Sequence, residues 1–155
     1  MPVIVIGADT EYGMAIAEAL TRRQGEVRAF VTDVESAKPL RGLGIKVAVG
    51  DVSDASHIEG ASRQAFSAVV VAESALDGRE RSFAKSYDVL VRAWAEGLQG
   101  AGVTRIIWVG SEAAPPPAVA AATAECVAID IRDRSPRQVA DEAVRLDDLA
   151  VIDPH

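Results

Sequence analysis

The first twenty residues of the chain constrain its fold more than any other stretch. A short apolar run, Val3–Ile6, leads directly into Gly7, and Gly13 follows six residues later. A helix-like pattern then covers residues 12–23. A buried strand, a glycine turn and a helix in this order open the dinucleotide-binding fold. The sequence therefore predicts an α/β domain whose first turn is a candidate nucleotide site.

Short β-rich runs alternate with longer helical patterns along the whole chain. The predicted strands, mostly apolar on both faces, are Val3–Ile6, Val27–Val31, Lys46–Val49, Ala68–Ala72, Arg105–Val109 and Leu149–Ile152. The predicted helices cover residues 12–23, 34–42, 55–64, 79–100 and 136–146. Such strands suit a parallel sheet buried between two helical layers. We expect one α/β domain over residues 1–155, with a doubly wound sheet in the order 3-2-1-4-5 and a candidate sixth strand beside the fifth.

The sequence pattern predicts structure clearly in residues 79–100 and poorly in residues 112–134. The stretch 79–100 has an apolar stripe at helical spacing, which predicts packing against the sheet. Its members are Phe83, Tyr87, Leu90, Val91, Trp94 and Leu98. Residues 112–134 are harder to interpret, because three consecutive prolines break regular structure and only the Ala-rich stretch 118–128 allows a short helix.

The charge and cysteine content narrow the classes of partner. A formal net charge of -7 argues against nucleic acid and anionic membranes, both of which require a concentrated basic face. No apolar run approaches the roughly 20 residues of a membrane helix, and we expect no signal peptide. The single Cys126 cannot form an internal disulfide, which suits the reducing cytoplasm.

The sequence offers no recognisable metal site. The only histidines, His57 and His155, form no ligand spacing with Cys126. The neighbouring Asp147 and Asp148 are interpreted as solvated surface. We therefore expect no bound metal.

The glycine turn departs from the usual dinucleotide motif at its middle position. Gly7 fits the glycine that makes the tight turn, and Gly13 fits the one that lets the helix pack closely. Thr10 replaces the middle glycine, and we expect its side chain to stand in the space of the pyrophosphate. Asp9 and Glu11 add negative charge beside it, which weakens binding of an anion. The alternative is that the two glycines only close a strand–helix corner and bind nothing.

The end of the second strand bears on the choice of cofactor. Thr32 and Asp33 lie there, and an acidic residue at this point can hydrogen-bond the adenosine ribose. Asp33 therefore favours NAD over NADP, although both remain compatible with the pattern. Capping of the helix over 34–42 explains Asp33 equally well.

The order and spacing of several motifs resemble the atypical short-chain dehydrogenase/reductase group, in particular its NmrA-like, NAD(P)-binding members. The segment GADTEYG stands where that family has its glycine loop, Gly50-Asp51 matches its adenine-contacting Gly-Asp, and VVVAES at 69–74 resembles its fourth strand and the turn beneath the cofactor. AGVTRIIWVGS at 101–111 is similar to its lead-in to strand five. The resemblance implies an NAD(P) site formed by Gly7, Asp9, Thr10, Glu11, Tyr12, Gly13, Thr32, Asp33, Asp51, Val52, Ala72 and Glu73.

The chain lacks the Tyr-x-x-x-Lys pair that the resemblance would lead one to expect. Its only tyrosines, Tyr12 and Tyr87, are followed four residues later by Ile16 and Val91. The chain also stops at His155, where relatives continue into a substrate-binding region. We therefore expect no catalytic residues of the usual kind.

Three functions follow from these observations. The first is a small NAD(P)-binding or cofactor-sensing module without reductase activity. The second is a non-binding interaction protein, as a homodimer, with a degenerate phosphate loop. The third is an oxidoreductase or isomerase that uses other residues, such as Ser111, Glu73 or Asp51.

Overall fold

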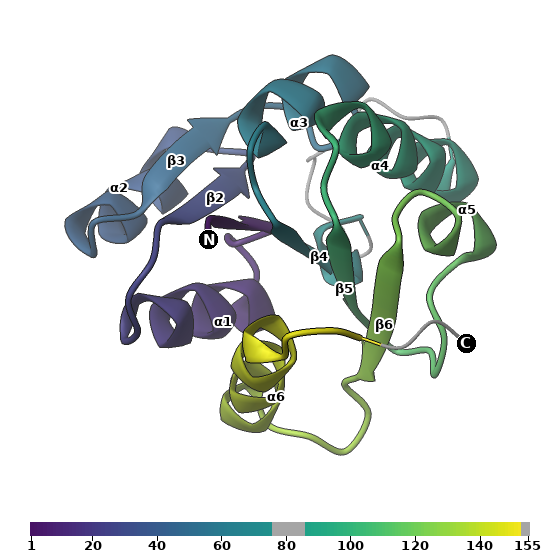
Figure 1. The fold of residues 1–155 in the computed structure, drawn as a ribbon. Helices are drawn as coiled ribbons and strands as arrows, with labels where there is room; N and C mark the ends of the chain where they lie inside the picture. The colour runs from purple at the N-terminus through teal and green to yellow at the C-terminus, as the bar shows by residue number, and fades with distance from the viewer. Residues whose placement is uncertain (76–85, 153–155) are drawn as a thin grey trace.

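A computed structural model describes residues 1–75 and 86–152 of the chain. Within these residues, six parallel strands form one sheet in the order β3-β2-β1-β4-β5-β6, with helices on both faces (Figure 1). The strands are β1 Val3–Ile6, β2 Val27–Val31, β3 Lys46–Val49, β4 Ser67–Val71, β5 Arg105–Gly110 and β6 Glu125–Asp130. The predicted doubly wound α/β fold and its strand order are confirmed.

The helices divide into two layers. They are α1 Glu11–Thr21, α2 Val34–Gly42, α3 Ala55–Ser62, α4 Tyr87–Ala101, α5 Pro117–Ala120 and α6 Pro136–Asp148, with a 3₁₀ turn, η1, at Ala72–Ala75. Buried side chains of α1, α2 and α6 share one apolar core with one face of the sheet. Those of α3, α4 and α5 share a second core with the opposite face.

The strand side chains explain why both faces are covered. In β1, Val3 and Val5 belong to the core beneath α1 and α6, whereas Ile4 and Ile6 belong to the core beneath α3 and α4. All four are at most 1% exposed. Successive side chains of a strand point to opposite faces, so an apolar run of this kind requires a helical layer on each side.

The sixth strand lies elsewhere in the sequence than predicted. Leu149–Ile152 is not a strand, and β6 is formed instead by Glu125–Asp130, which pairs with β5. The prediction of a short helix within 118–128 is therefore wrong beyond Ala120, where α5 ends. Most of β6 is only half buried and its sequence, ECVAID, mixes polar and small residues, so it lacks the apolar signature of a central strand.

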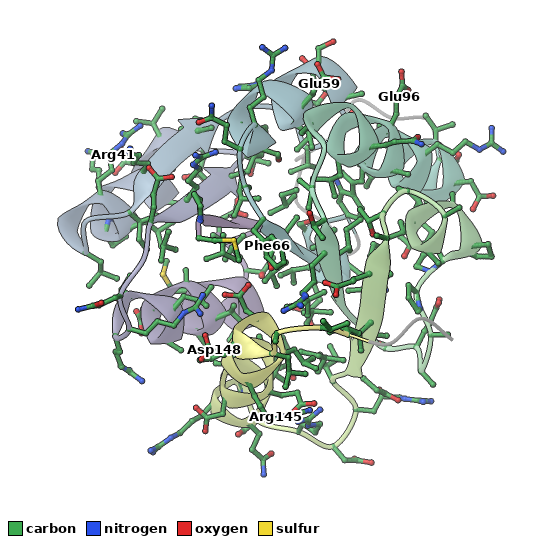
Figure 2. The ribbon with its side chains drawn as sticks, in the orientation of Figure 1. Arg41, Glu59, Phe66, Glu96, Arg145 and Asp148 are labelled. Carbon is green, nitrogen blue, oxygen red and sulfur yellow. The ribbon has the colours of Figure 1, made fainter. Side chains whose placement is uncertain are left out.

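The apolar stripe of α4 packs against the sheet as predicted. Leu90, Val91, Trp94 and Leu98 are buried in the core beneath α3 and α4, and Tyr87 packs at its margin. Phe83, the remaining member of the stripe, lies outside the described residues. Figure 2 shows Glu96 of α4 and Glu59 of α3 on the outer surface, away from this core. The charged face of the predicted helix is thus the solvent face.

No helix within residues 1–75 and 86–152 combines the length and the apolar character that crossing a membrane requires.

Candidate functional site

The carboxyl ends of the parallel strands carry most of the residues that the sequence singled out. In open α/β sheets, ligands bind at this edge, where the strand order reverses. Here the reversal lies between β1 and β4, since β2 and β3 continue on one side and β5 and β6 on the other. Gly7, Thr32, Gly50 and Ala72 directly follow β1 to β4, so the structure brings these four predicted positions to one edge.

Gly7 makes the turn that leaves β1. Its φ angle of +89° lies in the left-handed region that favours glycine. A Cβ atom added there would also lie 2.8 Å from the Cβ of Ser74, which belongs to the turn after β4. Gly7 therefore allows both the turn and the close approach of the β1 and β4 connections.

Gly13 allows α1 to begin directly against that turn. A Cβ atom at this position would lie only 2.0 Å from the carbonyl oxygen of Gly7. No larger residue fits without moving the helix away from the strand. Gly13 thus has the helix-packing role expected of the third glycine in a dinucleotide loop.

The side chain of Thr10 does not occupy the position expected from the sequence. It is 5% exposed and turns back into the loop, where its hydroxyl donates to the Gly7 carbonyl at 2.7 Å and accepts from the Gly13 amide at 3.0 Å. It therefore acts as the N-cap of α1. The expectation that this side chain stands in the pyrophosphate space is wrong, because the hydroxyl satisfies polar groups inside the loop.

Asp9 connects the loop after β1 to the end of β2. Its carboxylate accepts hydrogen bonds from the Thr32 hydroxyl at 2.7 Å and from the Thr32 amide at 3.3 Å. Asp33, the next residue, accepts from the Ser36 amide at 2.7 Å and caps α2. The capping interpretation of Asp33 is confirmed, and its carboxylate remains half-buried at the strand end.

The residues after β3 form a compact turn. Asp51 accepts from the Ser53 amide at 2.8 Å and from the Ser53 hydroxyl at 2.7 Å. Val52 is fully buried, and its carbonyl accepts a 2.7 Å hydrogen bond from the indole of Trp94 in α4. Val52 therefore contributes backbone and packing to this edge, whereas Asp51 offers a carboxylate that is not fully buried.

Tyr12 links α1 to the connection between β6 and α6. Its hydroxyl donates to the carbonyl of Arg134 at 3.3 Å. Burial raises the pKa of this phenol above its usual 10.0, and the carboxylates of Glu73 and Glu11 raise it further. The phenol is therefore neutral at physiological pH, and both predicted acidic residues lie within electrostatic reach of the first turn of α1.

The ends of β4 and β5 complete the edge. Ala72 is buried, and the Ser74 hydroxyl donates to the Val71 carbonyl at 2.8 Å. Beyond β5, Ser111 is exposed. At the start of α4, burial raises the pKa of Tyr87, with Glu112 and then Asp88 adding to the effect. No residue of this region forms the Tyr-x-x-x-Lys pair.

These features fit a dinucleotide better than a metal ion. Gly7 and Gly13 let the first turn of α1 lie directly against the end of β1, and the amide groups of a helix N-terminus attract phosphate. Within residues 1–75 and 86–152, no three His, Cys, Asp or Glu side chains gather as metal ligands. Burial raises the pKa of Cys126 to about 11, so this thiol is not activated for nucleophilic attack.

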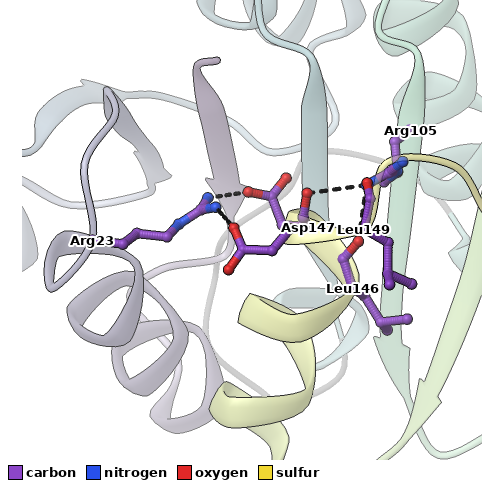
Figure 3. Close-up of polar contacts among 6 residues, drawn as sticks. Arg23, Arg105, Leu146, Asp147 and Leu149 are labelled. Atoms are coloured by element: carbon purple, nitrogen blue, oxygen red, sulfur yellow. Dashed lines mark hydrogen bonds and ion pairs between the residues drawn. The ribbon is translucent and has the colours of Figure 1, made fainter.

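The opposite edge of the sheet contains a charged network that the sequence did not predict. The Arg105 side chain, 0% exposed, donates to Glu125 at 2.8 Å and to the carbonyls of Leu146, Asp147 and Leu149 at 2.9, 3.0 and 2.7 Å. Arg23 pairs with Asp147 and Asp148, as Figure 3 shows at the end of α6. The interpretation of Asp147 as solvated surface is wrong, since its side chain is only 6% exposed.

One further residue at the carboxyl edge also escaped the sequence analysis. Trp108 is a fully buried residue of β5, and its indole nitrogen has no hydrogen-bond partner among the residues that the structure describes. In sequence it is one more apolar residue in the run Arg105–Gly110, so no pattern distinguishes it from the rest of the core.

Several solved structures share this fold. Serine dehydrogenase from Escherichia coli is 19% identical, with 97% of this chain and 92% of that one covered and a TM-score of 0.64. Triphenylmethane reductase from Citrobacter sp. is 18% identical over 96% of this chain and 46% of that one, with a TM-score of 0.60. The NADPH-dependent quinone oxidoreductase of Escherichia coli, solved with NADPH, is 16% identical over 94% and 44%, with a TM-score of 0.58. The chain thus spans less than half the length of the last two proteins.

Sequence comparison identifies the family. None of the curated proteins matches the chain significantly. A family model for NAD(P)H-binding proteins, however, matches residues 7–147, which is most of the chain and begins at the first glycine of the loop. The match agrees with the resemblance to NmrA-like proteins and with the NAD(P)-type fold of the structural neighbours. The chain belongs to the NAD(P)H-binding family.

Proposed function

We propose that this protein binds NAD(H) across the carboxyl ends of β1, β2 and β4 and works as a cofactor-binding or cofactor-sensing module. The observation that carries the proposal is the turn from Gly7 to Gly13, whose two glycines let α1 begin directly against the end of β1 and beside the turn after β4. Thr10 supports it, since its inward hydroxyl leaves the outer side of the loop to the backbone. The diphosphate would lie against the N-terminus of α1.

The acidic residues at this edge favour NAD over NADP. Asp9 and Asp33 lie at the junction of β1 and β2, where the adenosine ribose of a dinucleotide binds. The 2′-phosphate of NADP would add close to two negative charges beside these carboxylates. Repulsion of this kind amounts to about 1–3 kcal/mol before screening, and we expect NADP to bind about tenfold more weakly than NAD.

A sensing role fits the chain better than a reductase role. The Tyr12 hydroxyl donates to the Arg134 carbonyl, and its pKa is raised rather than lowered. Neither Tyr12 nor Tyr87 is followed four residues later by a lysine, which would lower the pKa of the phenol toward neutral pH. We propose the cytoplasm as the compartment, because the free Cys126 thiol and a nicotinamide cofactor both suit it.

Isothermal titration calorimetry with NAD, NADH, NADP and NADPH tests this function. We expect heats of binding for NAD and NADH below 1 mM and weaker binding of both phosphorylated forms. A reductase survey with carbonyl substrates and NADH should show no turnover. If all four cofactors fail to bind at 1 mM, the proposal is wrong and the non-binding homodimer becomes the better account, which light scattering can check.

A further inference from the structure

A groove of about 520 Å³ lies between α1 and α6, two helices that cover the same face of the sheet (Figure 1). We call it the α1/α6 groove. Three alanines line it: Ala15 is half-buried, and Ala19 and Ala140 are at most 9% exposed. Side chains this small let another helix approach the groove closely.

Four charged side chains, two from each helix, also line the α1/α6 groove. They are Glu18 and Arg22 of α1 and Arg137 and Asp141 of α6. All four are exposed, and none of them forms an ion pair within residues 1–75 and 86–152. Their charges cancel, although the whole chain carries a formal net charge of -7. A second copy of the chain therefore meets less repulsion at this groove than over the acidic protein as a whole.

The two helices run in the same direction. At their first turns, the Tyr12 hydroxyl of α1 donates to the carbonyl of Arg134, just before α6. Beyond their last turns, Arg23 pairs with Asp147. Along α1 the acidic residue of the groove precedes the basic one by four residues, and along α6 the order is reversed. The two helices therefore present opposite charge sequences in the same direction.

A two-fold axis parallel to both helices makes this charge order self-complementary. Such an axis places α1 of one copy opposite α6 of the other, with both helices running the same way. Glu18 then faces the partner's Arg137, and Arg22 faces the partner's Asp141. Because the contact is isologous, symmetry repeats each pair.

We propose that the α1/α6 groove is the surface through which two copies of this chain associate. A neutral set of two acidic and two basic residues selects neither a polyanion nor a polycation, whereas it complements its own two-fold image. The inference goes beyond the proposed function and does not depend on it, because no residue of the groove belongs to the candidate cofactor site.

Sedimentation velocity of the full chain tests whether the dimer forms. We expect monomer to convert to dimer as the protein concentration rises from about 1 to about 100 μM, the range of a modest interface. The dimer should weaken at least tenfold in about 1 M salt, because exposed ion pairs are screened. A monomer over this whole concentration range in low salt would overturn the proposal.

Two single charge reversals test which side chains meet. Glu18→Arg and Arg137→Glu each place like charges opposite one another, so each should weaken the dimer at least tenfold. A mixture of the two variants should dimerise again, because every contact between the unlike copies then joins opposite charges. The double variant should also recover, with the ion pair reversed. Single variants that stay monomeric when mixed, or a dimer that both reversals leave intact, would contradict this interface.

Matched controls separate the interface from general charge effects and from the cofactor site. Glu35→Arg and Lys38→Glu make the same charge changes in an exposed pair on α2 and should leave the dimer unchanged. Circular dichroism checks that each variant is folded. NAD affinity should be the same in the monomeric variants as in the wild type. If NAD does not bind but the mixed variants dimerise, the proposed function fails and the interface stands.

Discussion

Different interactions hold together the two ends of the parallel strands. We call the side where the strands begin the amino edge and the side where they end the carboxyl edge. At the amino edge, buried Arg105 binds Glu125 and three carbonyls at the end of α6, and Arg23 pairs with Asp147 and Asp148 (Figure 3). At the carboxyl edge, Asp9 accepts from Thr32, and the loop after β1 depends on close backbone contacts at its glycines. Arginines and acidic side chains thus fix the amino edge, whereas tight backbone packing around a glycine turn shapes the carboxyl edge. We infer that the first edge serves stability and the second serves binding.

The largest expected effect comes from breaking the amino edge. Arg105→Met should destabilise the fold by about 3–5 kcal/mol, because it leaves Glu125 without its buried partner and the end of α6 without its donor. Urea unfolding measures the change. The matched control is Arg145→Ala on α6, whose exposed pair with Glu142 should contribute less than about 1 kcal/mol (Figure 2). Equal effects of the two variants would contradict a special role of Arg105.

A methyl group at the glycine turn should affect both stability and binding. Gly13→Ala places a Cβ atom 2.0 Å from the Gly7 carbonyl, so we expect a loss of about 1–3 kcal/mol and at least tenfold weaker NAD binding. Calorimetry on protein shown to be folded by circular dichroism measures the binding. Gly60→Ala in α3 is the control, since its added Cβ meets no atom within 4 Å beyond its chain neighbours and its own helix backbone, and helix propensity favours alanine. Unchanged NAD affinity in Gly13→Ala would remove the turn from the site.

Part of the pH dependence of stability should come from Glu125 at the amino edge. Hydrogen bonding from Arg105 lowers the pKa of Glu125 below its ordinary 4.5, and the Ile152 amide adds to the effect. A depressed pKa means that Glu125 stabilises the fold above about pH 4.5 and loses this contribution as the pH falls through the folded-state pKa. Glu125→Gln should therefore lose less stability than wild type between pH 5 and pH 3 in urea titrations. A parallel pH profile for both proteins would contradict this assignment.

The smallest effect is expected at Thr10. Thr10→Gly restores the usual glycine pattern and removes a hydroxyl that turns into the loop, so NAD affinity should stay within about threefold of wild type. Stability should fall by only a few tenths of a kcal/mol, as for other N-cap changes to glycine. Calorimetry and thermal unfolding check both values. Binding that tightens more than tenfold would mean that the threonine side chain obstructs the cofactor after all.

The elements at the carboxyl edge were easier to predict than the contacts at the amino edge, because they depend on sequence patterns within a short stretch of the chain. An apolar run, two glycines six residues apart and a helical period lie within one short stretch, and they predicted β1, the turn and α1. The direction of the Thr10 side chain was not predictable in this way, since it depends on which backbone groups the folded loop leaves unsatisfied.

The remaining errors concern contacts between distant parts of the chain. β6 is a half-exposed edge strand without an apolar pattern, and residues 149–152 were mistaken for it because they are apolar. In the structure, the Ile152 amide donates to Glu125 and the Leu149 carbonyl accepts from Arg105. These partners lie 27 and 44 residues away, beyond the reach of any local pattern.

Chemical-shift mapping with NAD tests the contrast between the edges most directly. In ¹⁵N-labelled protein, we expect NAD to shift the backbone signals of Gly7, Glu11, Gly13 and Thr32. The signals of Arg105 and of the α6 residues from Leu146 to Asp148 should not move. Shifts confined to the end of α6, or no shifts at saturating NAD, would contradict the account that the carboxyl edge is the binding edge.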